Sequence, residues 1–203
     1  MNVSKENSMI KQLTLGTALG AIVLFLWSFI AWTFIPWPGD PIRSFTNDDA
    51  VITAMKANVP RSGVYILPNE VKRTPGMTDE QYKKADQDAM NRMAQGPMMF
   101  ASVRLEPMGS ISKYFVVGFL TDLFVALLAT ILLLQTNRLS YVGRVAFVLG
   151  VGAIIFAGGH LDEWNWWGFS NAYIAMQLGV LLIGWFLAGL VIAIFVRGKT
   201  FVA

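Results

Sequence analysis

Four long apolar segments constrain this chain more than any other feature of its sequence. They cover residues 13–35, 114–134, 140–159 and 172–196 and contain very few charges. A helix needs about 20 apolar residues to cross the roughly 30 Å of hydrocarbon in a bilayer. Each segment meets that requirement, so the sequence predicts an all-α membrane fold, a bundle of four transmembrane helices.

The first apolar segment follows Lys5 and Lys11, as the core of a signal peptide would. Signal cores are shorter, however, at roughly 7–15 apolar residues. We therefore expect the segment to be a retained membrane anchor.

Lysine and arginine predict the orientation of the four helices. Of 16 such residues, ten lie between the first and second apolar segments, and none lies between the third and fourth. The other six are Lys5, Lys11, Arg138, Arg144, Arg197 and Lys199. Short basic loops stay in the cytoplasm, whereas long segments cross regardless of charge. Both termini are therefore predicted to be cytoplasmic, and residues 36–113 to face outward.

Residues 36–113 carry signals for regular structure. Thr46 with Asp49, and Thr78 with Gln81, fit the capping box that begins a helix, which predicts helices to about Ala57 and Gln95. Residues 63–67 and 98–105 are candidate strands, whose pairing the sequence leaves open. The sequence thus predicts a small α+β extracytoplasmic cap inserted between helices 1 and 2.

Three regions follow from this interpretation. Residues 1–35 hold the cytoplasmic N-terminus and the first helix, residues 36–113 the cap, and residues 114–203 the other three helices with a cytoplasmic C-terminus. The cap has few large apolar side chains, so we expect it to rest on the outer ends of the helices.

Composition argues against several kinds of site. The chain has no cysteine and a single histidine, His160, which excludes disulfides, thiolate metal sites and a bis-histidine haem. Its basic residues form no stripe of the kind that binds nucleic acid. We therefore expect no cofactor, no metal and no nucleic-acid partner.

Asp122 is the most conspicuous polar residue in the apolar segments. It lies eight residues into the second one, about 12 Å below the outer surface. A carboxylate at that depth should face the bundle and find a partner. It is either a proton or cation site or a structural acid that pairs with Thr121, Gln177 or Ser28, with Gln177 nearest in depth.

The segment of residues 158–169 is unusual in combining acids, a histidine and aromatic residues. His160, Asp162 and Glu163 are residue types that bind divalent ions, but their spacing matches no common metal motif. Trp164, Trp166 and Trp167 could grip a ligand or form an interfacial aromatic belt, which we favour. We expect the segment to be the loop between the third and fourth helices.

Small residues recur at a spacing of four in the first and last apolar segments. The pairs are Gly16 and Gly20, Ala175 and Gly179, Gly184 and Ala188, and Gly189 and Ala193. Such pairs allow helices to approach closely. Packing within one bundle explains them more simply than dimerisation does.

Parts of the sequence resemble known membrane proteins. Four predicted helices with a large first outer loop look like the claudin arrangement, but the paired cysteines and Gly-Leu-Trp signature of that family are missing. Residues 44–51, 62–69 and 164–169 resemble segments of bacterial inner-membrane proteins to which no activity is assigned. The resemblance implies a bacterial inner membrane and no mechanism.

Three functions remain open on the sequence. The first is a non-enzymatic module that binds or assembles with a lipid or a membrane-protein partner, or with copies of itself. The second is a small transport or proton-relay unit centred on Asp122. The third is a periplasmic-edge enzyme using His160, Asp162 and Glu163. We expect the first, because the case for an enzyme depends only on His160, Asp162 and Glu163, whose spacing matches no common motif.

Overall fold

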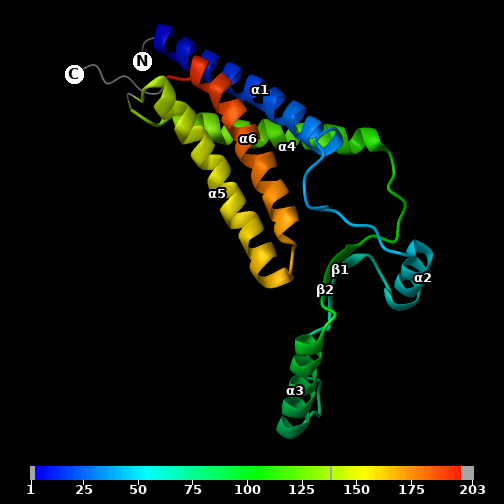
Figure 1. Ribbon diagram of the computed structural model, residues 1–203. Coiled ribbons are helices and arrows are strands. Elements are labelled where there is room, and N and C mark those ends of the chain that lie inside the picture. Colours follow the sequence, from blue (N-terminus) through cyan, green and yellow to red (C-terminus); the bar gives the residue numbers. More distant parts are fainter. Residues whose placement is uncertain (1–2, 138, 198–203) are drawn as a thin grey trace. The chain divides into compact units, whose positions relative to one another are not determined.

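The four apolar segments form the four longest helices of the computed structural model, which describes residues 3–137 and 139–197 (Figure 1). These helices are α1 (Val3–Thr33), α4 (Ile111–Leu134), α5 (Tyr141–Trp167) and α6 (Asn171–Phe195). Each is long and apolar enough to cross a membrane, which confirms that part of the prediction. Among the residues used for orientation, the side chain of Lys5 and all of Arg138 and Lys199 lie outside the described part.

Contacts divide the chain into two compact units. The first contains the residues up to Pro41, Gly109–Asp162 and the residues from Ser170 onward. The second contains Ile42–Met108 and Glu163–Phe169. Its elements are α2 (Asp48–Asn58), β1 (Gly63–Leu67), α3 (Asp79–Gln95), β2 (Met99–Val103) and the last turn of α5.

Small residues bring α1 against both α4 and α6. A Cβ atom added at Gly20 would lie 2.7 Å from Ile192 Cδ1 and 3.5 Å from Ala126 Cβ. Ala21, Ala126 and Ala188 are fully buried in the same core. The predicted packing within one bundle is confirmed at the glycines Gly16, Gly20, Gly179, Gly184 and Gly189, where an added Cβ would meet another part of the bundle. It is wrong at Ala175, which is exposed.

A basic side chain joins α5 to the end of α6. Arg144 Nε donates to the carbonyl of Ala193 at 3.1 Å, and its Nη1 donates to the carbonyl of Leu139 at 2.8 Å. Tyr141 Oη donates to the carbonyl of Leu190 at 2.9 Å. The last carbonyls of a helix have no partner within that helix, and a cation there also favours the helix dipole. Arg144 therefore has a structural role.

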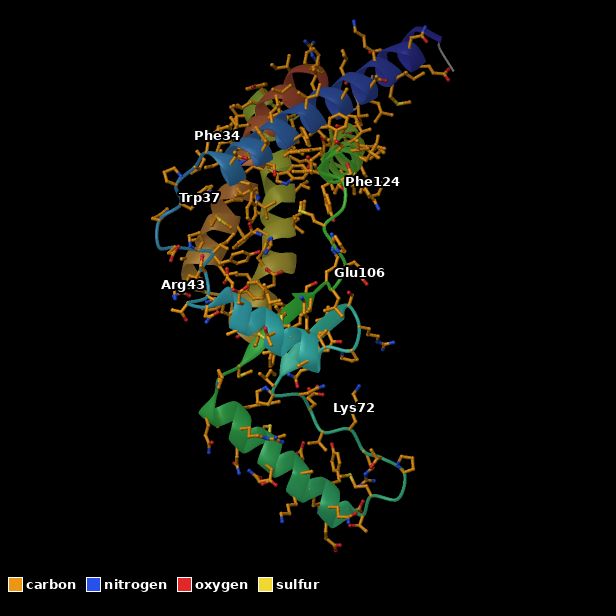
Figure 2. All side chains as sticks on the ribbon, turned by 90° about the vertical axis from the view of Figure 1, so that its right-hand side faces the viewer. Phe34, Trp37, Arg43, Lys72, Glu106 and Phe124 are labelled. Carbon is orange, nitrogen blue, oxygen red and sulfur yellow. The ribbon has the colours of Figure 1, made fainter. Side chains whose placement is uncertain are left out.

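The second unit contains a two-stranded antiparallel sheet, which settles the pairing that the sequence left open. Gly63 is opposite Val103, and Leu67 is opposite Met99. Ser62 links the residues that flank the Gly63–Val103 end of the sheet: its hydroxyl donates to Glu106 Oε2 at 2.6 Å and accepts from the Leu105 amide at 2.9 Å. Figure 2 shows Glu106 just beyond the end of β2.

Helix α3 begins and ends as predicted. Thr78 Oγ1 accepts from the amide of Gln81 at 3.2 Å, and Gln81 Oε1 accepts from the amide of Thr78 at 3.0 Å. This reciprocal pair is the predicted capping box. Gly96 ends the helix at a φ of 66°, a conformation that suits glycine.

Several predicted boundaries differ from the structure: β2, for example, is shorter than the strand expected over residues 98–105, and two helix boundaries are wrong for a local reason. Helix α2 begins one residue later than expected, because Asn47 caps it and accepts from the Ala50 amide at 2.9 Å. Helix α5 continues through the segment that we expected to be a loop and ends at Trp167. Nothing between Gly159 and Trp167 breaks a helix, and the break comes at Gly168, which has a φ of 72°.

Candidate ligand-binding site

Asp122 lies at the junction of two cavities in the first unit. The larger cavity, of about 310 Å³, lies between α1 and α4. The smaller, of about 180 Å³, is bounded by residues of all four long helices. Asp122 and Ser28 line both cavities, and no other lining residue is shared. This pair therefore separates one cavity from the other.

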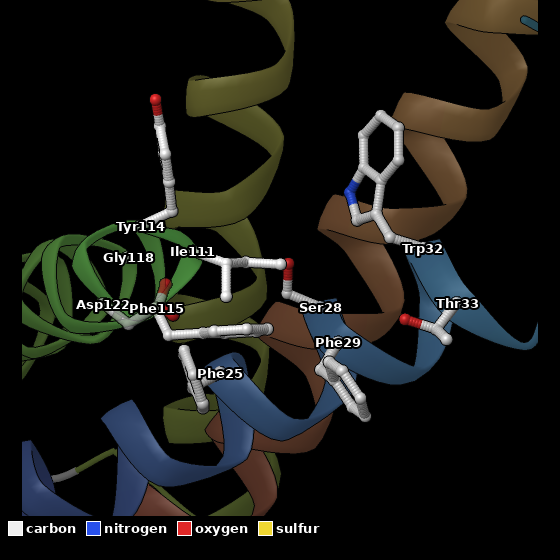
Figure 3. Close-up of a pocket in the computed structure, with 10 residues that line it drawn as sticks. All are labelled: Phe25, Ser28, Phe29, Trp32, Thr33, Ile111, Tyr114, Phe115, Gly118 and Asp122. Carbon is white, nitrogen blue, oxygen red and sulfur yellow. The ribbon is translucent and has the colours of Figure 1, made fainter. Parts of the chain in front are cut away.

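Aromatic residues make up half of the larger cavity's lining. The lining residues are Phe25, Ser28, Phe29, Trp32 and Thr33 from α1, and Ile111, Tyr114, Phe115, Gly118 and Asp122 from α4 (Figure 3). Phe115 packs edge to face against Phe25 at 6.3 Å and against Phe29 at 6.1 Å between ring centroids. This geometry, typical of aromatic pairs, joins the two helices along one side of the cavity.

Helical spacing explains why a cavity forms beside Asp122. Gly118 is four residues before Asp122, so the two lie on the same face of α4, one turn apart. A Cβ atom at Gly118 would be 3.9 Å from the nearest neighbour, Phe25 Cε2. The missing side chain leaves open volume next to the carboxyl group.

Two tryptophans shape the smaller cavity. Its lining residues are Leu24, Trp27, Ser28, Asp122, Val125, Ile155, Val180, Leu181, Gly184 and Trp185. The Trp27 indole N–H donates to the carbonyl of Val180 at 2.8 Å, which fixes that ring between α1 and α6. The cavity is therefore almost wholly apolar apart from Ser28 and Asp122.

The partners predicted for Asp122 bond elsewhere. Gln177 Nε2 contacts Tyr173 Oη at 3.4 Å, and Thr121 Oγ1 donates to the carbonyl of Val117 at 2.9 Å. Within residues 3–137 and 139–197, the half-buried Asp122 carboxyl makes no hydrogen bond. It does face the bundle, where it shares the smaller cavity with Val180 and Gly184 of α6. Of the expected partners, only Ser28 lies beside the same cavities.

The structure does not assemble His160, Asp162 and Glu163 into a metal site. All three lie on α5, and Asp162, two residues after His160, points in a different direction from it. The His160 ring instead lies 5.8 Å from the ring of Phe156, one turn earlier. In the described part of the chain, no group of three or more His, Asp or Glu side chains could hold a metal ion.

The three tryptophans at the end of α5 differ in their surroundings. Trp164, Trp166 and Trp167 are all exposed. Within the second unit, Trp167 stacks on Phe100 of β2, with ring centroids 4.6 Å apart. None of the three lines either cavity described above.

The aromatic residues of the larger cavity were not predicted as site residues. Phe25, Phe29 and Phe115 are ordinary residues for an apolar helix, and sequence does not reveal which faces of α1 and α4 meet. One signal was present: a glycine one turn before the acid, among large side chains.

Comparisons of the chain with protein-family models, with curated proteins and with solved structures each find no match. The resemblance to bacterial inner-membrane proteins thus stays an expectation.

Proposed function

We propose that the chain is a multi-pass protein of a bacterial inner membrane, with both termini in the cytoplasm and the residues between α1 and α4 outside. The distribution of side chains supports membrane insertion. Small residues such as Ala126 and Ala188 fill the core, whereas large apolar residues such as Phe124 and Ile154 are exposed. Exposed apolar area on this scale is unusual in a soluble protein and suits contact with lipid.

Within that membrane, the protein binds an amphiphilic ligand in the cavity between α1 and α4 and catalyses no reaction. The observation that carries this proposal is the cavity itself: about 310 Å³, lined by five aromatic residues, with one carboxyl group at its boundary. Known ligand sites share this character, being mostly apolar with a few polar groups that orient the ligand. The amphiphilic ligand is a lipid or part of a membrane-protein partner.

Native mass spectrometry of protein released from its own membranes tests the proposal. Wild-type protein should retain a bound small molecule. Gly118→Leu, which places a side chain in the cavity, should lose it. Gly150→Leu is the matched control, because Gly150 is also a half-buried helical glycine and lines neither cavity.

The outcomes separate a cavity ligand from annular lipid. An adduct present in wild type and Gly150→Leu but absent from Gly118→Leu supports the proposal. An adduct retained equally by all three proteins, or by none, contradicts it.

A second candidate function is proton relay, which the position of Asp122 favours. Its carboxyl and the Ser28 hydroxyl are the polar groups common to both cavities, and ionisable groups inside helical bundles often carry protons. Liposomes containing the protein and a trapped pH dye should then show proton flux that Asp122→Asn abolishes and Thr121→Val preserves. Flux no greater than in empty liposomes would exclude the relay.

A further inference from the structure

We infer that the ligand of the cavity between α1 and α4 is an organic cation, an ammonium group carrying apolar substituents. This inference rests on the proposed function and specifies the chemical class of its ligand. It follows from the charge, the aromatic lining and the hydrogen-bonding groups of the cavity, taken in turn.

The charge of the cavity lining favours a cation. Asp122 is the only residue with a formal charge among the described residues that line either cavity. A carboxylate among apolar groups is costly unless a positive charge compensates it. No lysine or arginine lines the cavities, so the protein does not supply that charge there. A cationic ligand would.

The aromatic lining of the cavity also favours a cation. Phe25, Phe29, Trp32, Tyr114 and Phe115 all line the larger cavity, and Figure 3 draws them with its other lining residues. Aromatic faces carry partial negative charge and attract cations, and cages of such rings are the usual means of binding quaternary ammonium groups. A lining of five aromatic residues combined with a single carboxylate is complementary to an ammonium ion in both respects.

The hydrogen-bonding groups of the larger cavity argue against an anionic ligand. An anionic head group, such as a phosphate, would need several N–H donors or a basic side chain. Apart from the acid, the polar side chains of the larger cavity are the hydroxyls of Ser28, Thr33 and Tyr114 and the indole of Trp32. Bringing an anion beside the Asp122 carboxylate would also place like charges together. A quaternary ammonium group, which donates no hydrogen bond, meets none of these obstacles.

Two probes of nearly identical shape isolate the effect of charge. Benzyltrimethylammonium is a cation, and neopentylbenzene is its uncharged counterpart with carbon in place of nitrogen. Binding is measured by calorimetry with the full chain in nanodiscs of digalactosyldiacylglycerol, a lipid without an ammonium group that could compete. Empty nanodiscs correct for partition of the probes into lipid.

The cation should bind the wild-type protein saturably and more tightly than its uncharged counterpart. Asp122→Asn should weaken cation binding by about tenfold or more, the effect of losing roughly 1.4 kcal/mol. Asp122→Glu, which keeps the charge, should retain most of the affinity. Phe115→Leu keeps the apolar surface but removes a ring. It should weaken binding of the cation severalfold and leave the affinity for neopentylbenzene unchanged.

The results distinguish this inference from the function on which it rests. Equal affinity for both probes, unaffected by Asp122→Asn, would overturn the cation assignment while leaving a cavity for apolar ligands. Binding of neither probe, together with an unchanged native adduct in Gly118→Leu, would overturn both. If Asp122→Asn does not fold, the Phe115→Leu comparison decides, because it leaves the acid intact.

Discussion

Two threonine hydroxyls in the helical core lack a hydrogen-bond partner in the described part of the chain. They belong to Thr17 on α1 and Thr130 on α4, and both oxygen atoms are buried. Thr130 is 0% exposed, and its Oγ1 would lie 3.1 Å from a Cβ atom at Gly16. A buried hydroxyl without a partner lowers stability, by about 1–3 kcal/mol in soluble proteins.

Thr130→Val should therefore stabilise the protein, by about 1 kcal/mol, because it replaces an unpaired hydroxyl with a methyl group. Thermal unfolding in nanodiscs measures the effect. Thr121→Val is the control: its hydroxyl already donates to a carbonyl and is exposed, so little change is expected. A lower unfolding temperature for Thr130→Val would mean that the hydroxyl contributes a favourable contact.

The Ser62 hydroxyl controls the acidity of Glu106. Its hydrogen bond is the main reason why the pKa of the Glu106 carboxyl lies below the ordinary value. A group with a lowered folded-state pKa stabilises the fold above its unfolded pKa, and that contribution is lost as pH falls through the folded pKa. The contact should therefore stabilise the two-stranded sheet at neutral pH and weaken in acid.

Ser62→Ala should raise the pKa of Glu106 towards its ordinary value, because it removes the donor. An NMR pH titration of the Glu106 side-chain carboxyl carbon measures this directly. Ser102→Ala, a substitution of an exposed serine on β2, should leave the pKa unchanged. An unaltered Glu106 titration in Ser62→Ala would show that another group lowers the pKa.

At the scale of elements, helices approach each other where glycine removes a side chain. On α5, Gly152 is buried, and an added Cβ atom would lie 2.5 Å from Trp185 Cγ. Gly150, on the same helix, has no neighbour within 4 Å of that position. The two glycines therefore offer a direct comparison between packing and helix propensity.

Gly152→Ala should destabilise the protein by about 1–3 kcal/mol, because the buried Trp185 ring has to move. Gly150→Ala should leave stability unchanged or raise it by up to about 1 kcal/mol, since alanine favours a helix. Thermal unfolding of both variants makes the comparison. Equal effects would mean that α5 does not pack against α6 as described.

The elements that could be predicted were those with a local cause. The α3 capping box and the continuous apolar helices depend only on neighbouring residues, and both are confirmed. The end of α5 was mispredicted because apolarity, not helix formation, stops near Gly159. The cavity around Asp122 depends on which faces of α1 and α4 meet, and no local pattern determines that.

At the scale of the whole molecule, the orientation proposed for the four helices has a direct test. The chain has no native cysteine, so single introduced cysteines report accessibility without background. Asn137 follows α4 and Asn165 lies near the end of α5, and both are exposed. In cells with a permeable outer membrane, an impermeant maleimide should label Asn165→Cys but not Asn137→Cys. Labelling of Asn137→Cys but not of Asn165→Cys would show that the helices have the opposite orientation.

Photolabelling tests most directly whether the cavity between α1 and α4 holds a ligand. The probe is an alkyl ammonium carrying a diazirine, irradiated with the protein in nanodiscs and mapped by peptide mass spectrometry. Adducts should concentrate in residues 25–33 and 111–122. Excess benzyltrimethylammonium should reduce their formation, and they should be absent from Gly118→Leu. Adducts spread over the exposed faces of α5 and α6, unchanged by Gly118→Leu, would contradict a ligand in this cavity.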